Sequence, residues 1–266
     1  MPQVRVGDIN VHYEIHGEGE PLLLVMGLGS DLSGWGLQTP GFSRKYRVVV
    51  FDNRGVGRTD APDMPYSIEM MADDTAGLMD MLGIDKAHVL GKSMGGYIAQ
   101  ELAIRHPGRI KSLILASTSA GPYVLETPIL EAWVGAVMEG ISRKAFFQLM
   151  LPFVFTDKTF ENPEMVRMAI DMIAGRSCPA PDHALARQFI ACVEHCARGR
   201  LSRITAPTLI LAGKDDLFMP FTLSEELAAS IPNARLVALE GGSHALNTDI
   251  PDKFNRTVLE FLAHIA

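Results

Sequence analysis

Cysteine is scarce in this chain of 266 residues, which contains only Cys178, Cys192 and Cys196. An odd number of cysteines, all in the second half, does not fit the disulfide frameworks of small secreted domains, so we expect three free thiols. The run from Cys192 to Cys196 includes His195, but no second ligand cluster accompanies it, whereas zinc sites normally combine two clusters. The sequence therefore predicts neither a metal site nor an organic cofactor.

Long apolar runs and clusters of positive charge are also absent. No stretch approaches the roughly 18 apolar residues of a membrane span, and residues 1–8 lack the basic and then apolar pattern of a secretion signal. The 24 Lys and Arg residues are outnumbered by 31 Asp and Glu residues, which gives a net charge of −7. Because the basic residues are scattered, they do not form the footprint of a nucleic-acid-binding protein. We expect a cytoplasmic protein without nucleic-acid or membrane partners.

The chain does contain short apolar, β-branched runs that alternate with amphipathic segments. Strands are predicted at Val4–Val6, Val11–Ile15, Leu22–Met26, Arg47–Phe51, His88–Leu90, Ser112–Ala116, Thr208–Ala212 and Arg235–Leu239. Helical spacing predicts helices at Ser67–Leu82, at Met94–Arg105 and around Phe254–Ile265. Strands that alternate with helices predict right-handed crossovers, and therefore an α/β protein with a mostly parallel sheet flanked by helices.

The strand pattern stops after Pro122 and resumes at Pro207. Between these prolines, apolar residues recur at helical spacing, as at Leu185, Phe189 and Val193. We expect a helical insertion over residues 121–203, acting as a lid, within a core formed by residues 1–120 and 204–266. A chain of this length can bury about three quarters of its unfolded surface, which suffices for one such core.

The strongest local motif is Gly91-Lys92-Ser93-Met94-Gly95, which lies between a predicted strand and a predicted helix. A sharp turn from strand to helix exposes a serine hydroxyl, and small glycines allow the two elements to approach closely around it. This context predicts that Ser93 is a nucleophile. Such a nucleophile needs an acid and then a histidine further along the chain.

Residues suited to both roles follow predicted core strands. His244 stands in the loop Gly241-Gly242-Ser243-His244, from which a general base could reach Ser93. Asp215 and Asp216 follow the strand that ends at Ala212. The carboxyl ends of strands are where open α/β sheets place their active sites, so either aspartate could orient the imidazole.

With these motifs the chain resembles the α/β-hydrolase superfamily from end to end. The resemblance implies an α/β-hydrolase fold and favours Asp216 as the acid, because the family's G-x-x-D…P pattern falls on Gly213, Asp216 and Pro220. It also implies an oxyanion hole formed by the backbone N–H groups of Met94 and Leu28. Many relatives have His-Gly where this chain has Met26-Gly27, but a backbone donor needs no histidine. The family's turn at Asp52, Arg54, Gly55 and Gly57 is interpreted as structural.

The segment from Leu28 to Leu32, followed by Trp35, resembles the corresponding part of 3-oxoadipate enol-lactonases and related carboxylesterases. Lys92, beside the nucleophile, could attract a substrate carboxylate, or its stem could pack between helices. We therefore expect a serine hydrolase that cleaves a small-molecule ester or lactone through an acyl-enzyme on Ser93. The same residues are compatible with a cofactor-free perhydrolase or haloperoxidase, or with a C–C bond hydrolase. A non-catalytic ligand receptor with this fold is a different class of function.

Overall fold

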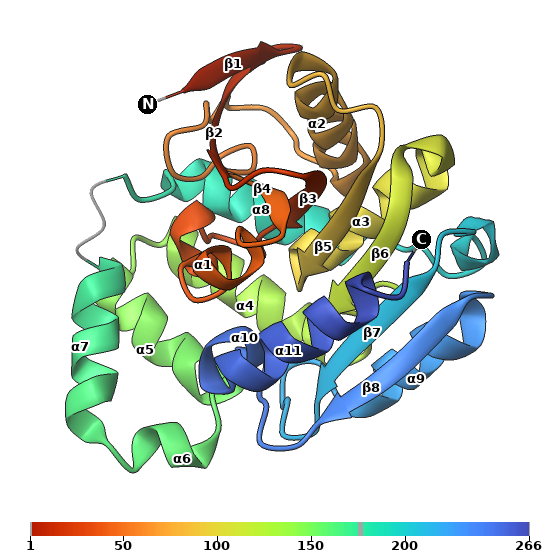
Figure 1. Cartoon of the computed structure of the whole chain (residues 1–266). Coiled ribbons are helices and arrows are strands. Elements are labelled where there is room, and N and C mark those ends of the chain that lie inside the picture. Colours follow the sequence, from red (N-terminus) through yellow and green to blue (C-terminus); the bar gives the residue numbers. More distant parts are fainter. Residues whose placement is uncertain (1, 175–177, 266) are drawn as a thin grey trace.

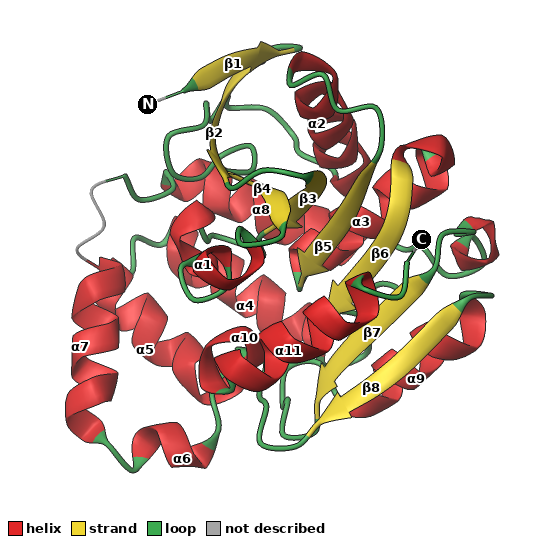
Figure 2. Ribbon diagram, in the orientation of Figure 1, coloured by secondary structure: helices red, strands yellow, loops and turns green. Residues whose placement is uncertain are grey.

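The computed structural model describes residues 2–174 and 178–265. Across these residues the strands form one eight-stranded sheet in the order β1-β2-β4-β3-β5-β6-β7-β8 (Figure 2). The strands are β1 (Gln3–Val6), β2 (Ile9–His16), β3 (Glu20–Val25), β4 (Tyr46–Phe51), β5 (Ala87–Lys92), β6 (Ile110–Ala116), β7 (Thr208–Gly213) and β8 (Ala234–Leu239). Strand β2 is antiparallel to β1 and β4, and all other neighbours are parallel. The predicted α/β class and mostly parallel sheet are confirmed.

Helices cover both faces of the sheet (Figure 1). In the view of Figure 1, helices α1 and α11 lie in front of the sheet, and α2, α3 and α9 lie behind it. These helices, together with α10, are α1 (Thr39–Phe42), α2 (Ile68–Met81), α3 (Met94–Arg105), α9 (Phe221–Ser230), α10 (Leu246–Asp249) and α11 (Pro251–Leu262). Within the described ranges, no helix is long and apolar enough to span a membrane.

The central strands are apolar at most positions because both of their faces are buried. In β3, Leu22 and Leu24 pack into a cluster with Phe254 of α11, while Leu23 and Val25 pack on the opposite face with residues of α2 and α3. The two layers hold β5 at the centre of the sheet, so the turn after β5 lies on a rigid support.

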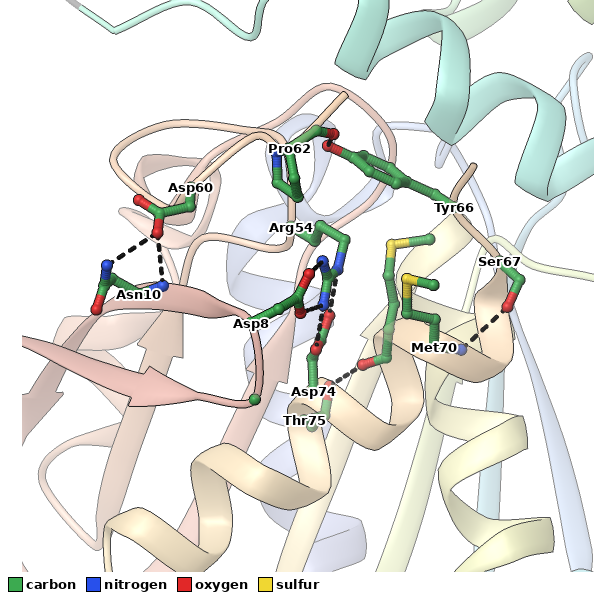
Figure 3. Close-up of polar contacts among 12 residues, drawn as sticks. Asp8, Asn10, Arg54, Asp60, Pro62, Tyr66, Ser67, Met70, Asp74 and Thr75 are labelled. Atoms are coloured by element: carbon green, nitrogen blue, oxygen red, sulfur yellow. Dashed lines mark hydrogen bonds and ion pairs between the residues drawn. The ribbon is translucent and has the colours of Figure 1, made fainter. Parts of the chain in front are cut away.

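The turn after β4 is fixed by charged side chains, of which Arg54 and Asp52 are buried. Figure 3 shows the Arg54 side chain between the carboxylates of Asp8 and Asp74, at 2.7 and 2.8 Å from Nη2. The carboxylate of Asp52 accepts hydrogen bonds from the backbone N–H groups of Leu32 (2.8 Å) and Arg58 (2.9 Å). These partners are protein groups, which gives the turn a structural role and anchors the loop that follows β3.

A helical segment connects β6 to β7. It contains α4 (Glu126–Met138), α5 (Arg143–Val154), α6 (Asp157–Phe160), α7 (Pro163–Ala174) and α8 (Asp182–Glu194). Residues 175–177 of the predicted insertion lie outside the described residues. The two ends of the segment meet, because the N–H of Ala197 donates a 2.8 Å hydrogen bond to the carbonyl of Ala120. Below, these helices are called the helical insertion.

Candidate active site

Ser93 occupies a strained turn between β5 and α3. Its φ and ψ angles are 56° and −124°, a region that residues with a side chain seldom adopt. The turn is held from β6, because the N–H of Ser93 donates to the carbonyl of Ala116 (2.9 Å) and the hydroxyl of Thr118 donates to the carbonyl of Ser93 (2.9 Å). The strain is therefore opposed by fixed neighbours, and the hydroxyl is presented at the edge of the sheet.

The two glycines of the motif are required by close backbone contacts. A Cβ atom on Gly91 would lie 2.1 Å from the carbonyl oxygen of Gly95, and one on Gly95 would lie 2.1 Å from the carbonyl oxygen of Val25. Neither distance is possible without moving the backbone. The spacing seen in the sequence thus has a steric cause in the packing of α3 against β3 and β5.

The structure brings the three predicted catalytic side chains together. Nε2 of His244 lies 3.0 Å from Oγ of Ser93, and Nδ1 of His244 lies 3.1 Å from Oδ2 of Asp216. All three residues are buried, with exposed fractions of 5 to 9%. This geometry allows His244 to accept the serine proton while Asp216 fixes the imidazole tautomer.

The two candidate aspartates have different surroundings. The second carboxylate oxygen of Asp216 accepts hydrogen bonds from the N–H groups of Phe218 (3.0 Å) and Met219 (2.7 Å), which orients the side chain toward His244. Asp215 is exposed. Only Asp216 therefore lies within hydrogen-bonding distance of the imidazole.

The backbone N–H groups of Leu28 and Met94 lack acceptors within the described part of the chain. Met94 is the first residue of α3, where an N–H has no partner inside the helix. The loop carrying Leu28 comes close to the nucleophile, since a Cβ on neighbouring Gly27 would lie 3.6 Å from Oγ of Ser93. Two free donors near one hydroxyl could stabilise an oxyanion.

Sequence reasoning missed a residue that holds this loop. Oε1 of Gln188, on α8, accepts a 2.9 Å hydrogen bond from the N–H of Gly29, and its Nε2 donates a 2.7 Å bond to the carbonyl of Arg54. Gln188 is fully buried. Helical spacing could place it on an inward face, but nothing local indicates which loop it would contact. The helical insertion thus directly contacts the loop that carries Leu28 and Gly29.

A cavity of about 540 Å³ opens beside Ser93 and His244. Its outer wall is the helical insertion, where Trp133 packs edge-on against Phe146 and Phe189 at ring distances of 6.3 and 6.0 Å. Trp133 also stacks on Phe218, whose ring is 5.0 Å from that of His244. The cavity suits an apolar organic molecule.

Lys92 lines the same cavity, as the anionic-substrate hypothesis requires. Burial lowers the pKa of its ammonium group to about 8, and the carboxylates of Asp216 and Asp249 oppose that shift. The side chain is therefore a cation near two protein carboxylates as well as near the cavity. Its role in binding substrate stays a prediction.

The one group of metal-ligand type found among the described residues is Glu69, Glu101 and His195. The guanidinium of Arg200 lies 2.6 Å from Oε1 of Glu101 and 3.9 Å from Oε1 of Glu69, which is where a cation would bind. Burial lowers the pKa of His195 to about 4, so the imidazole is neutral near pH 7. Arg200 therefore already pairs with both carboxylates of this cluster. Cys178, Cys192 and Cys196 are free thiols, as expected.

Comparisons with known proteins agree with the geometry. Residues 20–166 match the family described as alpha/beta hydrolase fold. A protein of Azorhizobium caulinodans with the provisional name carbamate hydrolase RutD is 31% identical over 100% of this chain and 99% of its own length. The crystal structure of an enol-lactonase from Burkholderia xenovorans is 32% identical with a TM-score of 0.90, over 99% of this chain and 100% of that one. A thermophilic esterase structure from Thermogutta terrifontis is 28% identical with a TM-score of 0.90, covering 100% and 99%. This chain belongs to the α/β-hydrolase family and is a hydrolase of that fold.

Proposed function

We propose that this protein hydrolyses a small-molecule carboxylic ester or lactone through an acyl-enzyme on Ser93. The observation that carries the proposal is the continuous series of contacts from Asp216 through His244 to Ser93, which ends at the wall of an apolar cavity. A serine activated by a neighbouring imidazole is a nucleophile suited to acyl transfer. The names of the enol-lactonase and the esterase support the same class of substrate.

The proposed reaction has two halves. Oγ of Ser93 attacks the substrate carbonyl while Nε2 of His244 takes the hydroxyl proton, and the oxyanion is stabilised by the N–H groups of Leu28 and Met94. The alcohol leaves with the proton from His244, and the acyl group stays on Ser93. A water molecule that has lost a proton to His244 then attacks the acyl carbonyl, and the acid leaves as Ser93 regains its proton.

The size and lining of the cavity argue against carbamate itself as the main substrate. A volume of about 540 Å³ falls within the range of pockets that hold whole organic molecules, and carbamate would fill only a small part of it. Aromatic rings such as those of Trp133 and Phe146 offer no recognition of so small and polar an anion. We therefore propose an organic acyl group, with the helical insertion as its lid.

A substrate panel tests the proposal. The purified protein is assayed with p-nitrophenyl esters of increasing acyl length, with aliphatic and enol lactones, and with carbamate. We expect multiple turnovers on esters or lactones and little on carbamate. Turnover of carbamate alone would overturn the choice of substrate, and binding of esters without product would indicate a receptor. Peroxide-dependent oxidation or C–C cleavage far faster than ester hydrolysis would move the function to those reactions.

A further inference from the structure

Glu126, the first residue of α4, places a carboxyl group in the wall of the same cavity. Its side chain is buried, with 1% of the residue exposed. Oε1 lies 3.3 Å from the hydroxyl of Tyr97, and Oε2 has no hydrogen-bond partner among the described residues. Leaving a carboxylate oxygen buried and unpaired is costly, so a group that stays this way in a ligand cavity points to an absent partner.

The hydroxyl groups near Glu126 cannot fully satisfy it. Tyr97 lies 2.7 Å from Oγ of Ser119, which in turn lies 2.9 Å from the carbonyl of Gly121. Each hydroxyl carries a single hydrogen atom. If Ser119 donates to Gly121, Tyr97 donates to Ser119 and has no hydrogen left for Glu126. From these hydroxyl groups, Glu126 receives at best one long hydrogen bond.

If this carboxyl group had a purely structural role at the start of α4, we would expect it to cap the helix. An acid at the start of a helix normally accepts hydrogen bonds from the helix's first N–H groups. Among the described residues, no N–H group of α4 donates a hydrogen bond to either carboxylate oxygen of Glu126. This residue of the cavity wall therefore has a carboxyl group without a helix-capping bond.

We propose that Glu126 accepts a hydrogen bond from the substrate, which therefore carries an N–H or O–H donor at a distance from the carbonyl that is cleaved. This inference rests on the proposed ester or lactone hydrolysis and adds a class of substrate to it: hydroxy or amino esters and lactones. Hydroxyl and amino groups share the ability to donate a hydrogen bond to Glu126. A protonated amino group would in addition interact with the charge of the carboxylate.

The protonation state of Glu126 gives the proposal a second readout. Burial raises the pKa of this carboxyl group to about 7. The Tyr97 hydroxyl, the backbone N–H of Tyr123 and the Arg198 guanidinium lower it, and the Asp216 carboxylate raises it. Cys192 on α8 also faces the site, but burial raises the pKa of its thiol well above the usual value, which keeps it neutral. Only ionised Glu126 is a full acceptor. The preference for donor-bearing substrates should therefore increase as pH rises through about 7.

The test compares matched esters in wild-type protein and variants. p-Nitrophenyl esters of unsubstituted, ω-hydroxy and ω-amino acids of increasing chain length are assayed, together with esters that carry the donor on the alcohol. The readout is the ratio of kcat/KM for the donor-bearing ester to that for the plain ester. A hydrogen bond to a charged group predicts a wild-type preference of about ten- to a hundredfold at the best length. Glu126→Leu should lose that preference. Glu126→Gln, whose amide oxygen is still an uncharged acceptor, should keep only a small and pH-independent part of it.

The control is Glu131→Gln, which removes an exposed acid from the same helix and should retain the wild-type ratio. His244 acts on both members of each ester pair, so its contribution to kcat/KM cancels in the ratio. An equal preference in wild type and both Glu126 variants, or a ratio in wild type that does not change with pH, would overturn the inference while ester hydrolysis stands. If Glu126→Leu does not fold, the isosteric Gln variant decides. Loss of all hydrolysis in wild type would instead contradict the proposed function.

Discussion

The two walls of the cavity differ in composition and in origin. The inner wall comes from the sheet and its loops and carries the polar groups of Ser93, His244 and the Leu28 loop. The outer wall comes from the helical insertion and is mostly apolar, with Trp133, Phe146 and Phe189 among its aromatic side chains. The comparison suggests a division of labour in which the sheet performs the chemistry and the insertion selects the substrate. Gln188 and Glu126 are polar residues of the insertion, and they show where this division can be tested.

The largest expected effect comes from removing the nucleophile of the inner wall. Ser93→Ala removes the nucleophile and should lower kcat by about a millionfold, as in other serine hydrolases, while substrate binding to the outer wall persists. The measurement combines steady-state kinetics with labelling by a fluorophosphonate probe. Wild-type protein should be labelled at one residue, and labelling that continues in Ser93→Ala would assign the nucleophile elsewhere.

A second variant pair sharpens the assignment of the acid. Asp216→Asn should lower kcat by about ten-thousandfold, because the amide no longer holds the imidazole in the required tautomer. Asp215→Asn is the matched control, since that neighbouring side chain is exposed and should affect kcat little. The opposite ranking, measured on the same ester, would give the role to Asp215.

Gln188 belongs to the insertion but holds a loop of the inner wall, so replacing it tests whether the two walls act separately. Gln188→Ala removes the hydrogen bond to Gly29 and should lower kcat about ten- to a hundredfold with a small change in KM. The reason is that the Leu28 loop, which carries a proposed oxyanion donor, would be displaced, and this affects the transition state most. Gln148→Ala removes an exposed glutamine of the same insertion and should behave as wild type. A change confined to KM would mean that Gln188 only shapes the pocket.

The smallest expected effect concerns Lys92, a residue of the inner wall that could also select the substrate. If the ammonium group binds a substrate carboxylate, Lys92→Met should lower kcat/KM for a dicarboxylic monoester about tenfold and leave p-nitrophenyl butyrate nearly unchanged. Ten is the lower limit for a hydrogen bond to a charged group, chosen because Asp216 and Asp249 also lie near the lysine. Equal losses on both esters would indicate support of the nucleophile turn instead.

Local sequence patterns predicted the inner wall better than the outer wall. The helix expected at Met94–Arg105 is α3 as predicted, and the Ser67 side chain caps α2 by accepting a hydrogen bond from the N–H of Met70. These elements follow from periodicity and capping within a few residues. The choice of Asp216 over Asp215 came from the family resemblance, because alternation along a loop does not say which carboxylate turns inward.

Glu126 and Gln188 could not be predicted in the same way. Gln188 acts on Gly29, 159 positions earlier in the chain, and on Arg54, 134 positions earlier. Glu126 acquires its properties from burial beside Tyr97, which depends on how α4 packs over α3. Periodicity indicates that a residue faces inward, but it does not identify the partner across the fold.

The hydrogen bond between Ala197 and Ala120 makes the insertion suitable for exchange as a module. Since its ends are already joined, a longer or shorter helical segment would change the entropy of loop closure only slightly, by about 0.6 kcal/mol for each doubling of length. A chimaera that replaces the residues between these two alanines should keep the sheet intact. The new segment would have to supply a substitute for Gln188. Without one, the N–H of Gly29 would have no acceptor on the insertion, and the Leu28 loop would lose its anchor on α8.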